Sequence, residues 1–120
     1  MLLFPKKPKY FKSFSNRKIV SNFRKKDNIL KFSKLGLIAK ESGFIPNFQI
    51  EAIRLFLRRL LKKRAQIFFR IFPNQPITKK PNEVRLGRGK GNFKYWTYYV
   101  KQGKIIIEVS EQNIKLLTLV

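Results

Sequence analysis

The spacing of apolar residues predicts one long helix, over Asn47–Ala65. Pro46 stands just before it, in a region where proline is common, and Asn47 suits a helix start. The apolar positions recur every three or four residues and would form one buried face. These positions are Ile50, Ile53, Phe56, Leu57, Leu60 and Leu61.

The opposite face of this predicted helix carries cations. Arg54, Arg58 and Lys62 follow one another at a spacing of four, with Arg59 and Lys63 beside them. Like charges at this spacing repel one another by a few tenths of a kcal/mol per pair. A solvated face usually mixes both signs of charge. The stripe is therefore better explained by an anion that lies along it.

Short runs of apolar, β-branched and aromatic residues predict four strands. Their bounds are Leu35–Lys40, Gln66–Phe72, Phe93–Val100 and Lys104–Val109. Gly43 and Pro46 predict a turn after the first strand, and three prolines predict a turn-rich stretch over Phe72–Pro81. The connection Lys101–Gly103 predicts a hairpin between the last two strands, because a short loop that ends in glycine favours one.

A second, short helix is predicted after this hairpin. Ser110 suits its cap and Glu111 its first turn. Ile114, Leu116 and Leu117 would pack inward. The sequence therefore predicts a mixed α+β fold with two helices.

A loop that alternates glycines with cations precedes the aromatic strand. Gly87, Gly89 and Gly91 can take positive φ and have no side chain to keep a partner away. Arg88 and Lys90 add charge to this bare backbone. Such a loop can lie against a phosphate backbone, with amide groups and cations both facing it. The alternative is the tip of a basic hairpin in solvent.

Two nucleotide-binding motifs are excluded for these glycines. A Walker loop needs serine or threonine after its Gly-Lys pair, whereas Gly91 and Asn92 follow Lys90. A dinucleotide fingerprint needs a helix after the glycines, whereas Phe93–Val100 predicts a strand.

The charge of the chain points to a polyanionic partner. The 120 residues, the size of one domain, include 28 lysines and arginines against six carboxylates, for a net charge of +22. Self-repulsion on this scale destabilises a compact monomer. Nucleic acid is the first candidate for the counter-charge and an anionic membrane the second. No apolar run approaches the ~18 residues of a membrane span, so we expect no membrane insertion.

The inventory of reactive side chains argues against an enzyme. The chain has no histidine and no cysteine, which removes the commonest general base and the commonest metal ligands. Its carboxylates are scattered singly, at Asp27, Glu41, Glu51, Glu83, Glu108 and Glu111. We therefore expect no catalytic residues, no cofactor and no metal site.

Residues 1–34 are predicted to form an extended basic arm ahead of a single domain over residues 35–120. Pro5 and Pro8 disfavour an early helix. Aromatic residues lie among the lysines and could stack on bases or dock on the domain. They are Phe4, Tyr10, Phe11, Phe14, Phe23 and Phe32. The alternative for this basic, acid-poor segment is a mitochondrial presequence.

Several motifs together resemble the large-subunit ribosomal protein L-sixteen family, whose archaeal and eukaryotic relatives are called L-ten-e. The resemblance covers most of the chain. The helix start is similar in Gln49-Ile50-Glu51-Ala52 and Arg54. The strand and turn are similar in Arg70-Ile71-Phe72-Pro73, Pro76-Ile77-Thr78 and Lys80-Pro81. The loop and the strands around it are similar in Val84-Arg85, Gly87, Gly89-Lys90-Gly91, Tyr95-Trp96, Gly103-Lys104 and Glu108.

The resemblance implies a fold and a role. The fold would be α+β, a mixed sheet with two helices in a hammerhead-like arrangement. The protein would be a structural constituent of the large ribosomal subunit. It would bind large-subunit rRNA near the aminoacyl-tRNA site, contact neighbouring ribosomal proteins, and support subunit assembly and tRNA accommodation.

Two sets of residues would make these contacts. The rRNA-binding cations would be Lys6, Lys7, Lys9, Lys12, Arg17, Lys18, Arg54, Arg58, Arg59, Lys62, Lys63, Arg88 and Lys94. The tRNA-proximal loop would comprise Arg85, Gly87, Gly89, Lys90 and Gly91.

The resemblance and the composition together suggest a mitochondrial protein. Lysine, isoleucine, phenylalanine and asparagine are abundant, and their codons are rich in A and T. The opening Met1-Leu2, Pro5-Lys6 and Lys9 also resemble the family's first residues, so we expect a retained N-terminus. Family members usually continue past the last helix, and the missing segment would be lost or supplied by another chain. Alternative locations are a plastid or the bacterial cytoplasm.

Two other functions stay open at this point. One is a basic amphipathic protein on a membrane surface, built on the predicted helix over Asn47–Ala65. The other is a non-specific DNA-binding protein, although the chain has no helix-turn-helix or zinc-finger pattern.

Overall fold

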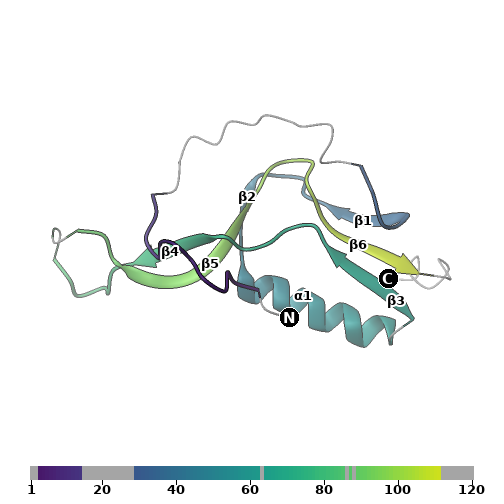
Figure 1. Cartoon of the computed structure of the whole chain (residues 1–120), viewed down its shortest axis with the longest axis horizontal. Helices are drawn as coiled ribbons and strands as arrows, with labels where there is room; N and C mark the ends of the chain where they lie inside the picture. The colour runs from purple at the N-terminus through teal and green to yellow at the C-terminus, as the bar shows by residue number, and fades with distance from the viewer. Residues whose placement is uncertain (1–2, 15–28, 63, 86, 88, 112–120) are drawn as a thin grey trace.

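The computed structural model describes residues 3–14, 29–62, 64–85, 87 and 89–111, which form one helix and six strands (Figure 1). The elements are β1 (Leu35–Ile38), β2 (Gly43–Pro46), α1 (Asn47–Leu61), β3 (Ala65–Phe69), β4 (Gln75–Lys79), β5 (Asn92–Val100) and β6 (Ile105–Glu111). The described part of the chain is therefore α+β, as predicted.

The strands form two antiparallel sheets of three strands each, and not the one mixed sheet that the resemblance implied. One has the order β1-β6-β3 and the other β2-β5-β4. The predicted hairpin between the last two strands is wrong, because β5 and β6 are the central strands of different sheets. The Lys101–Gly103 turn does form, with Gly103 at φ 77°. Its backbone is bonded to Ala39, whose N–H donates to Lys104 and whose carbonyl accepts from Gly103, at 2.9 and 2.8 Å.

Two strands were predicted as turns. Gly43 and Pro46 are the ends of β2, and β4 lies inside the predicted turn-rich stretch over Phe72–Pro81. Both strands contain a proline, Pro46 or Pro76, and both are edge strands. An edge strand tolerates a proline because its outer side needs no ladder hydrogen bond.

Helix α1 ends before the predicted Ala65. Lys62 takes a left-handed conformation, with φ 41°, and the N–H of Arg64 donates to the carbonyl of Leu61 at 2.8 Å. This closes the helix so that Ala65 can begin β3 directly.

The buried face of α1 is narrower than predicted. Ile50 and Leu61 are buried, and Ile53 and Leu57 are half-buried. Phe56 and Leu60, predicted to point inward, are 62% and 44% exposed. The physical reason is that, in the described part of the chain, α1 packs on one side only, against β2, β3 and β5 (Figure 1).

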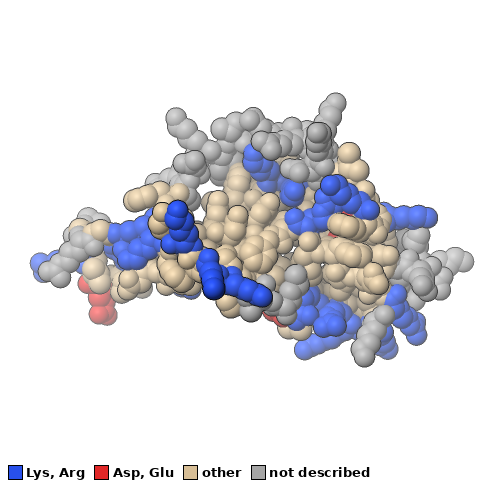
Figure 2. All heavy atoms as spheres, in the orientation of Figure 1, with Lys and Arg blue, Asp and Glu red and all other residues tan. Residues whose placement is uncertain are grey.

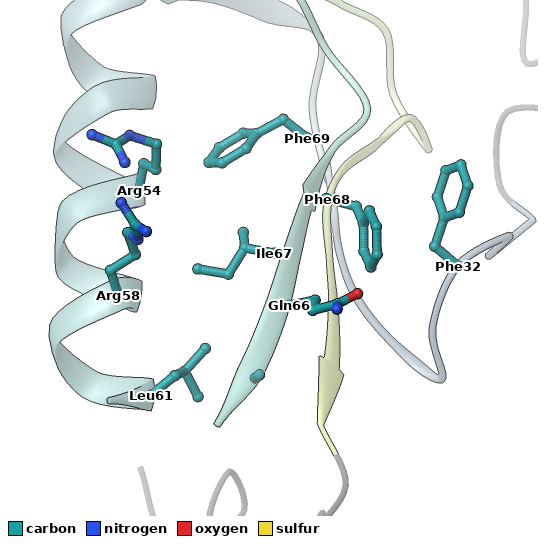
Figure 3. Close-up of a pocket in the computed structure, with 9 residues that line it drawn as sticks. Phe32, Arg54, Arg58, Leu61, Gln66, Ile67, Phe68 and Phe69 are labelled. Carbon is teal, nitrogen blue, oxygen red and sulfur yellow. The ribbon is translucent and has the colours of Figure 1, made fainter. Parts of the chain in front are cut away.

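Strand β6 contributes more buried apolar side chains to the core than any other described element. Ile105, Ile106, Ile107 and Glu108 are all buried, because both faces of this central strand are covered. On one face, the neighbouring strand β3 turns Ile67 and Phe69 toward α1 (Figure 3). On the other face, Phe68 points away from α1 toward the segment that contains Phe32 (Figure 3).

The carboxylate of Glu108 binds the backbone of residues 31 and 32 on the face of β6 that lies away from α1. It is fully buried and pairs with the guanidinium of Arg70. Its Oε2 accepts the backbone N–H groups of Lys31 and Phe32, at 3.0 and 2.7 Å. The ring of Phe32 then stacks on Phe68, with centroids 5.0 Å apart. A buried charge needs such partners, because an unpaired one is very costly.

These contacts set the protonation of Glu108. Burial by itself raises the pKa of this carboxyl, but the hydrogen bonds from Phe32, Arg70 and Lys31 and the charge of Arg70 outweigh it. The pKa is therefore held below its ordinary value of 4.5.

Part of the predicted second helix is strand instead. Ser110, its predicted cap, and Glu111 belong to β6 and pair with Gln66 and Ala65 of β3. Ile114, Leu116 and Leu117 lie outside the described residues.

The molecule is elongated and keeps much of its surface exposed. It measures 56 × 31 × 27 Å, and its radius of gyration is 17.3 Å. A compact domain of this length would have about 14 Å. The accessible surface is 10093 Å², against roughly 6,800 Å² for a compact monomer of this mass. A chain with this shape has a large area available for partners.

The Glu108 contacts predict an acid-sensitive stability. A lowered pKa in the folded state means that the ionised carboxylate stabilises the fold above the unfolded pKa of 4.5. This contribution is lost as the pH falls through the lowered pKa. We expect Glu108→Gln to unfold at lower denaturant than the parent chain at pH 7, with the difference shrinking below pH 4.5. Denaturant titrations from pH 7 to pH 3 would measure it.

Glu83→Gln is the matched control, because Glu83 is exposed and should leave stability unchanged at every pH. A deficit of Glu108→Gln that stayed constant across the whole pH range would contradict the assignment.

Candidate nucleic-acid interface

Basic side chains gather on several parts of the molecule. In the view of Figure 2, lysines and arginines lie over the β4–β5 end, along the N-terminal arm and along α1. Carboxylates are sparse on the same face (Figure 2). The surface therefore offers positive charge to a partner at both ends of its long axis.

The described part of the arm, residues 3–14, is anchored on the domain. Leu3 is 5% exposed and belongs to the core cluster. The ring of Phe11 packs against Phe93 and Trp96 of β5, with centroids 5.9 and 6.2 Å apart. Of the two roles predicted for the arm's aromatics, docking on the domain therefore holds for Phe11.

The glycine loop between β4 and β5 has the backbone expected of it at two positions. Gly87 and Gly89 have φ of 108° and 74°, which other residues rarely adopt. Gly91 does not take positive φ and serves a different purpose. A Cβ on Gly91 would lie 2.7 Å from the carbonyl carbon and oxygen of Lys79 and 2.8 Å from the nitrogen of Lys80. Only glycine allows this approach of two backbones.

Lysine side chains hold the carbonyl groups of this loop. Lys80 donates from its Nζ to the carbonyl of Gly87. Lys12, from the arm, donates to the carbonyl of Lys90 at 3.4 Å. The Nζ of Lys90 in turn lies 4.1 Å from the ring centroid of Phe14. The arm and the loop are thus one surface.

Sequence reasoning missed two cations of this surface, Lys79 and Lys80. With Lys94 of β5 they line a cavity of about 300 Å³, together with Pro81, Asn82, Asn92 and Phe93. The stretch around them was predicted as turns, so its lysine pair was not assigned a role. The signal that could have found them is the tandem Lys79-Lys80 next to the glycine loop.

The predicted cations of α1 do not share one environment. Arg54 and Arg58 line a cavity of about 750 Å³ between α1 and β3, with apolar walls that include Leu61, Ile67 and Phe69 (Figure 3). Arg59 and Lys62 are exposed. Arg58 is exposed as well, so of the described cations of the predicted stripe Arg54 alone is half-buried.

The charge of Arg54 is also neutralised by Glu51, which lies one turn earlier on α1. Its Nε donates to Oε2 of Glu51 at 2.9 Å, and its Nη2 donates to the other carboxylate oxygen. This hydrogen bonding outweighs desolvation and lowers the pKa of Glu51, while it raises that of Arg54. Arg54 is therefore less available to an external anion than Arg58.

The other predicted contact residues lie in several places. Lys6, Lys7 and Lys9 are exposed along the arm, and Arg85 is exposed before the glycine loop. Arg17, Lys18, Lys63 and Arg88 lie outside the described residues. The structure therefore brings together Lys12, Lys90 and Lys94 from the predicted set, with Lys79 and Lys80 added.

The described residues offer neither a metal site nor a membrane-spanning helix. No group of three or more carboxylate, histidine or cysteine side chains there could hold a metal ion. No described helix is long and apolar enough to cross a membrane.

Comparison with known proteins identifies the family. Residues 5–119 match the family described as ribosomal protein L16p/L10e. The chain belongs to this family.

Individual members of the L16p/L10e family are close relatives. The large ribosomal subunit protein uL16 of Blochmanniella pennsylvanica (strain BPEN) is 42% identical over 110 residues, which cover 92% of this chain and 80% of the relative. The protein of the same name from Protochlamydia amoebophila (strain UWE25) is 40% identical over 110 residues, 92% of this chain and 78% of the relative. The resemblance inferred from the motifs is thereby confirmed.

The close approach at Gly91 predicts a specific intolerance. In Gly91→Ala the added Cβ meets backbone atoms of Lys79 and Lys80, which cannot move aside as a side chain can. We expect the fold to lose about 1–3 kcal/mol, as overpacked sites do. Denaturant unfolding of the purified chain would measure the loss.

Gly43→Ala is the matched control for this prediction. A Cβ there meets no atom within 4 Å, and Gly43 does not take positive φ. Its stability should stay within about 1 kcal/mol of the parent chain. Equal losses in the two variants would show that the β4–β5 contact does not depend on Gly91.

Proposed function

We propose that this chain is a structural constituent of the large ribosomal subunit and has no enzymatic role. The observation that carries the proposal is the family match over residues 5–119, together with relatives whose names state that role. The net charge of +22 and the elongated shape agree with a chain whose counter-charge and remaining burial come from folded RNA.

The rRNA contacts of this proposal are made by phosphate-binding cations. Phosphate contacts position a protein without reading sequence, so specificity would come from the shape of the folded RNA. The candidates that the structure describes are Lys6, Lys7, Lys9, Lys12, Arg54, Arg58, Arg59, Lys62 and Lys94, to which we add Lys79 and Lys80. Arg54 ranks below the others because Glu51 already neutralises it.

The glycine loop is proposed to face tRNA near the aminoacyl-tRNA site. Arg85, Gly87, Gly89, Lys90 and Gly91 are the residues of this loop. The left-handed backbone at Gly87 and Gly89 supports the proposal, because it leaves amide groups uncovered by side chains. In this position the chain would support assembly of the subunit and accommodation of tRNA, beside neighbouring ribosomal proteins.

A mitochondrial ribosome is the proposed location. The support is compositional, since twelve phenylalanines and abundant lysine, isoleucine and asparagine suggest an A+T-rich code. The relatives named above are bacterial, so the bacterial cytoplasm and a plastid are the alternatives. The division into an arm over residues 1–34 and a domain over residues 35–120 stays a prediction, as does the part of the second helix that lies outside the described residues.

The proposal predicts how the chain sediments. On a sucrose gradient of a cell or organelle extract, we expect the chain, traced by mass spectrometry, to migrate with the large subunit at moderate and at high salt. Binding by surface charge alone would weaken by roughly 10³–10⁵ over a few-fold rise in salt. A chain that is built into folded RNA should resist that rise.

Absence from the subunit peak at both salt concentrations would refute the proposal. Binding to anionic vesicles in the presence of competing RNA would then favour the membrane-surface alternative. Equal affinity for duplex DNA and for structured RNA would favour a non-specific DNA-binding protein.

A further inference from the structure

The ring of Phe14 lies open beside the glycine loop. It is 89% exposed, which is unusual for a phenylalanine in a folded protein. The Nζ of Lys90 lies 4.1 Å from its centroid, so one face of the ring is engaged by a cation. The exposure of the side chain leaves the other face available to a flat partner.

The position of Phe14 is fixed by its neighbours in the arm. Phe11 is packed against Phe93 and Trp96, and Lys12 donates to the carbonyl of Lys90. Phe11 and Lys12 lie three and two residues before Phe14, and their contacts are with β5 and with the glycine loop. The ring is therefore presented to a partner by contacts on β5 and on the loop.

Cations that could bind a phosphate backbone lie at the same β4–β5 end of the molecule. The cavity of about 300 Å³ at the β4–β5 end contains Lys79, Lys80 and Lys94, and one of its walls is Phe93. Phe93 also touches Phe11 of the arm. An aromatic face next to a cationic groove is the combination by which proteins bind single-stranded nucleic acid.

We propose that Phe14 stacks on one unpaired nucleobase of RNA, while Lys90 and the lysines of the β4–β5 cavity neutralise the flanking phosphates. This inference rests on the proposed function, since it names a contact that the chain makes within ribosomal RNA or tRNA. An RNA strand supplies a π-face and negative charge together, and both are needed here.

Other aromatics of the arm are less suited to this role. Phe11 is packed against two rings of β5. Tyr10 is exposed, and the contact described for its ring is with Lys9, its neighbour in sequence, at 5.4 Å rather than with the glycine loop. Phe14 is thus the aromatic ring whose position is set by contacts of both the arm and the glycine loop.

The test uses the full chain and a short single-stranded RNA with one 2-aminopurine, whose fluorescence is quenched by stacking on an aromatic ring. The same RNA with an abasic nucleotide at that position is the second probe. Binding is measured at one fixed salt concentration for the parent chain, Phe14→Ala, Phe14→Leu and Phe56→Ala. Phe56 is the matched control, an exposed phenylalanine on α1.

We expect Phe14→Ala and Phe14→Leu to lose the quenching. Their affinity for the base-containing RNA should fall about 5- to 100-fold, the usual effect of removing a stacking ring. Affinity for the abasic RNA should be equal in all four chains. Phe56→Ala should behave as the parent chain does. The fluorescence of Trp96, the chain's single tryptophan, reports whether Phe11 still docks the arm in each variant.

Unchanged quenching in Phe14→Ala, or the same loss of affinity for the abasic RNA, would overturn the inference. Sedimentation of Phe14→Ala with the large subunit separates this failure from failure of the proposed function. If Phe14→Ala sediments with the large subunit and its RNA binding equals that of the parent chain, the ribosomal role is supported and the stacking contact is refuted.

Discussion

The excess of positive charge is the constraint on which the rest of this structure depends. Twenty-eight lysines and arginines face six carboxylates. In the described part of the chain, ion pairs join Glu51 to Arg54 and Glu108 to Arg70, so two of the carboxylates are already engaged inside the molecule. The remaining cations repel one another, and this repulsion destabilises the chain when it stands alone. Such a chain gains stability when a polyanion lies against it, which fits membership of a family whose named relatives belong to the large ribosomal subunit.

Within this constraint, the fold uses its few internal contacts to position its basic segments. The buried carboxylate of Glu108 accepts hydrogen bonds from the backbone of Lys31 and Phe32. These bonds hold the segment before β1 against the sheet. At the other end, Gly91 brings the loop against the backbone of β4, and Phe11 docks the arm on β5. Each contact joins residues far apart in the sequence, so cations from separate segments meet on one surface.

The sequence alone could predict the features that depend on local pattern. The existence of α1 follows from the spacing of Ile50, Ile53 and Leu57, and the polyanionic partner follows from the net charge of +22. Pairing could not be predicted, because β5 and β6 are adjacent in sequence yet each is the centre of its own sheet. The prolines of β2 and β4 led to a prediction of turns. The sequence does not show that these two strands lie at the edges of their sheets, where a proline is tolerated. For the same reason Lys79 and Lys80 went unassigned, and the contact of Glu108 with Phe32 spans 76 residues.

The most direct test is an electron cryo-microscopy structure of the large ribosomal subunit from the organism that encodes this chain. We predict density for the chain, with the Nζ atoms of Lys79, Lys80, Lys90 and Lys94 within about 4 Å of RNA phosphate oxygens, the distance of an ion pair. The arm and the glycine loop should face RNA together. A subunit without this chain would contradict the ribosomal role. A bound chain whose β4–β5 end faces solvent would contradict the assignment of the interface.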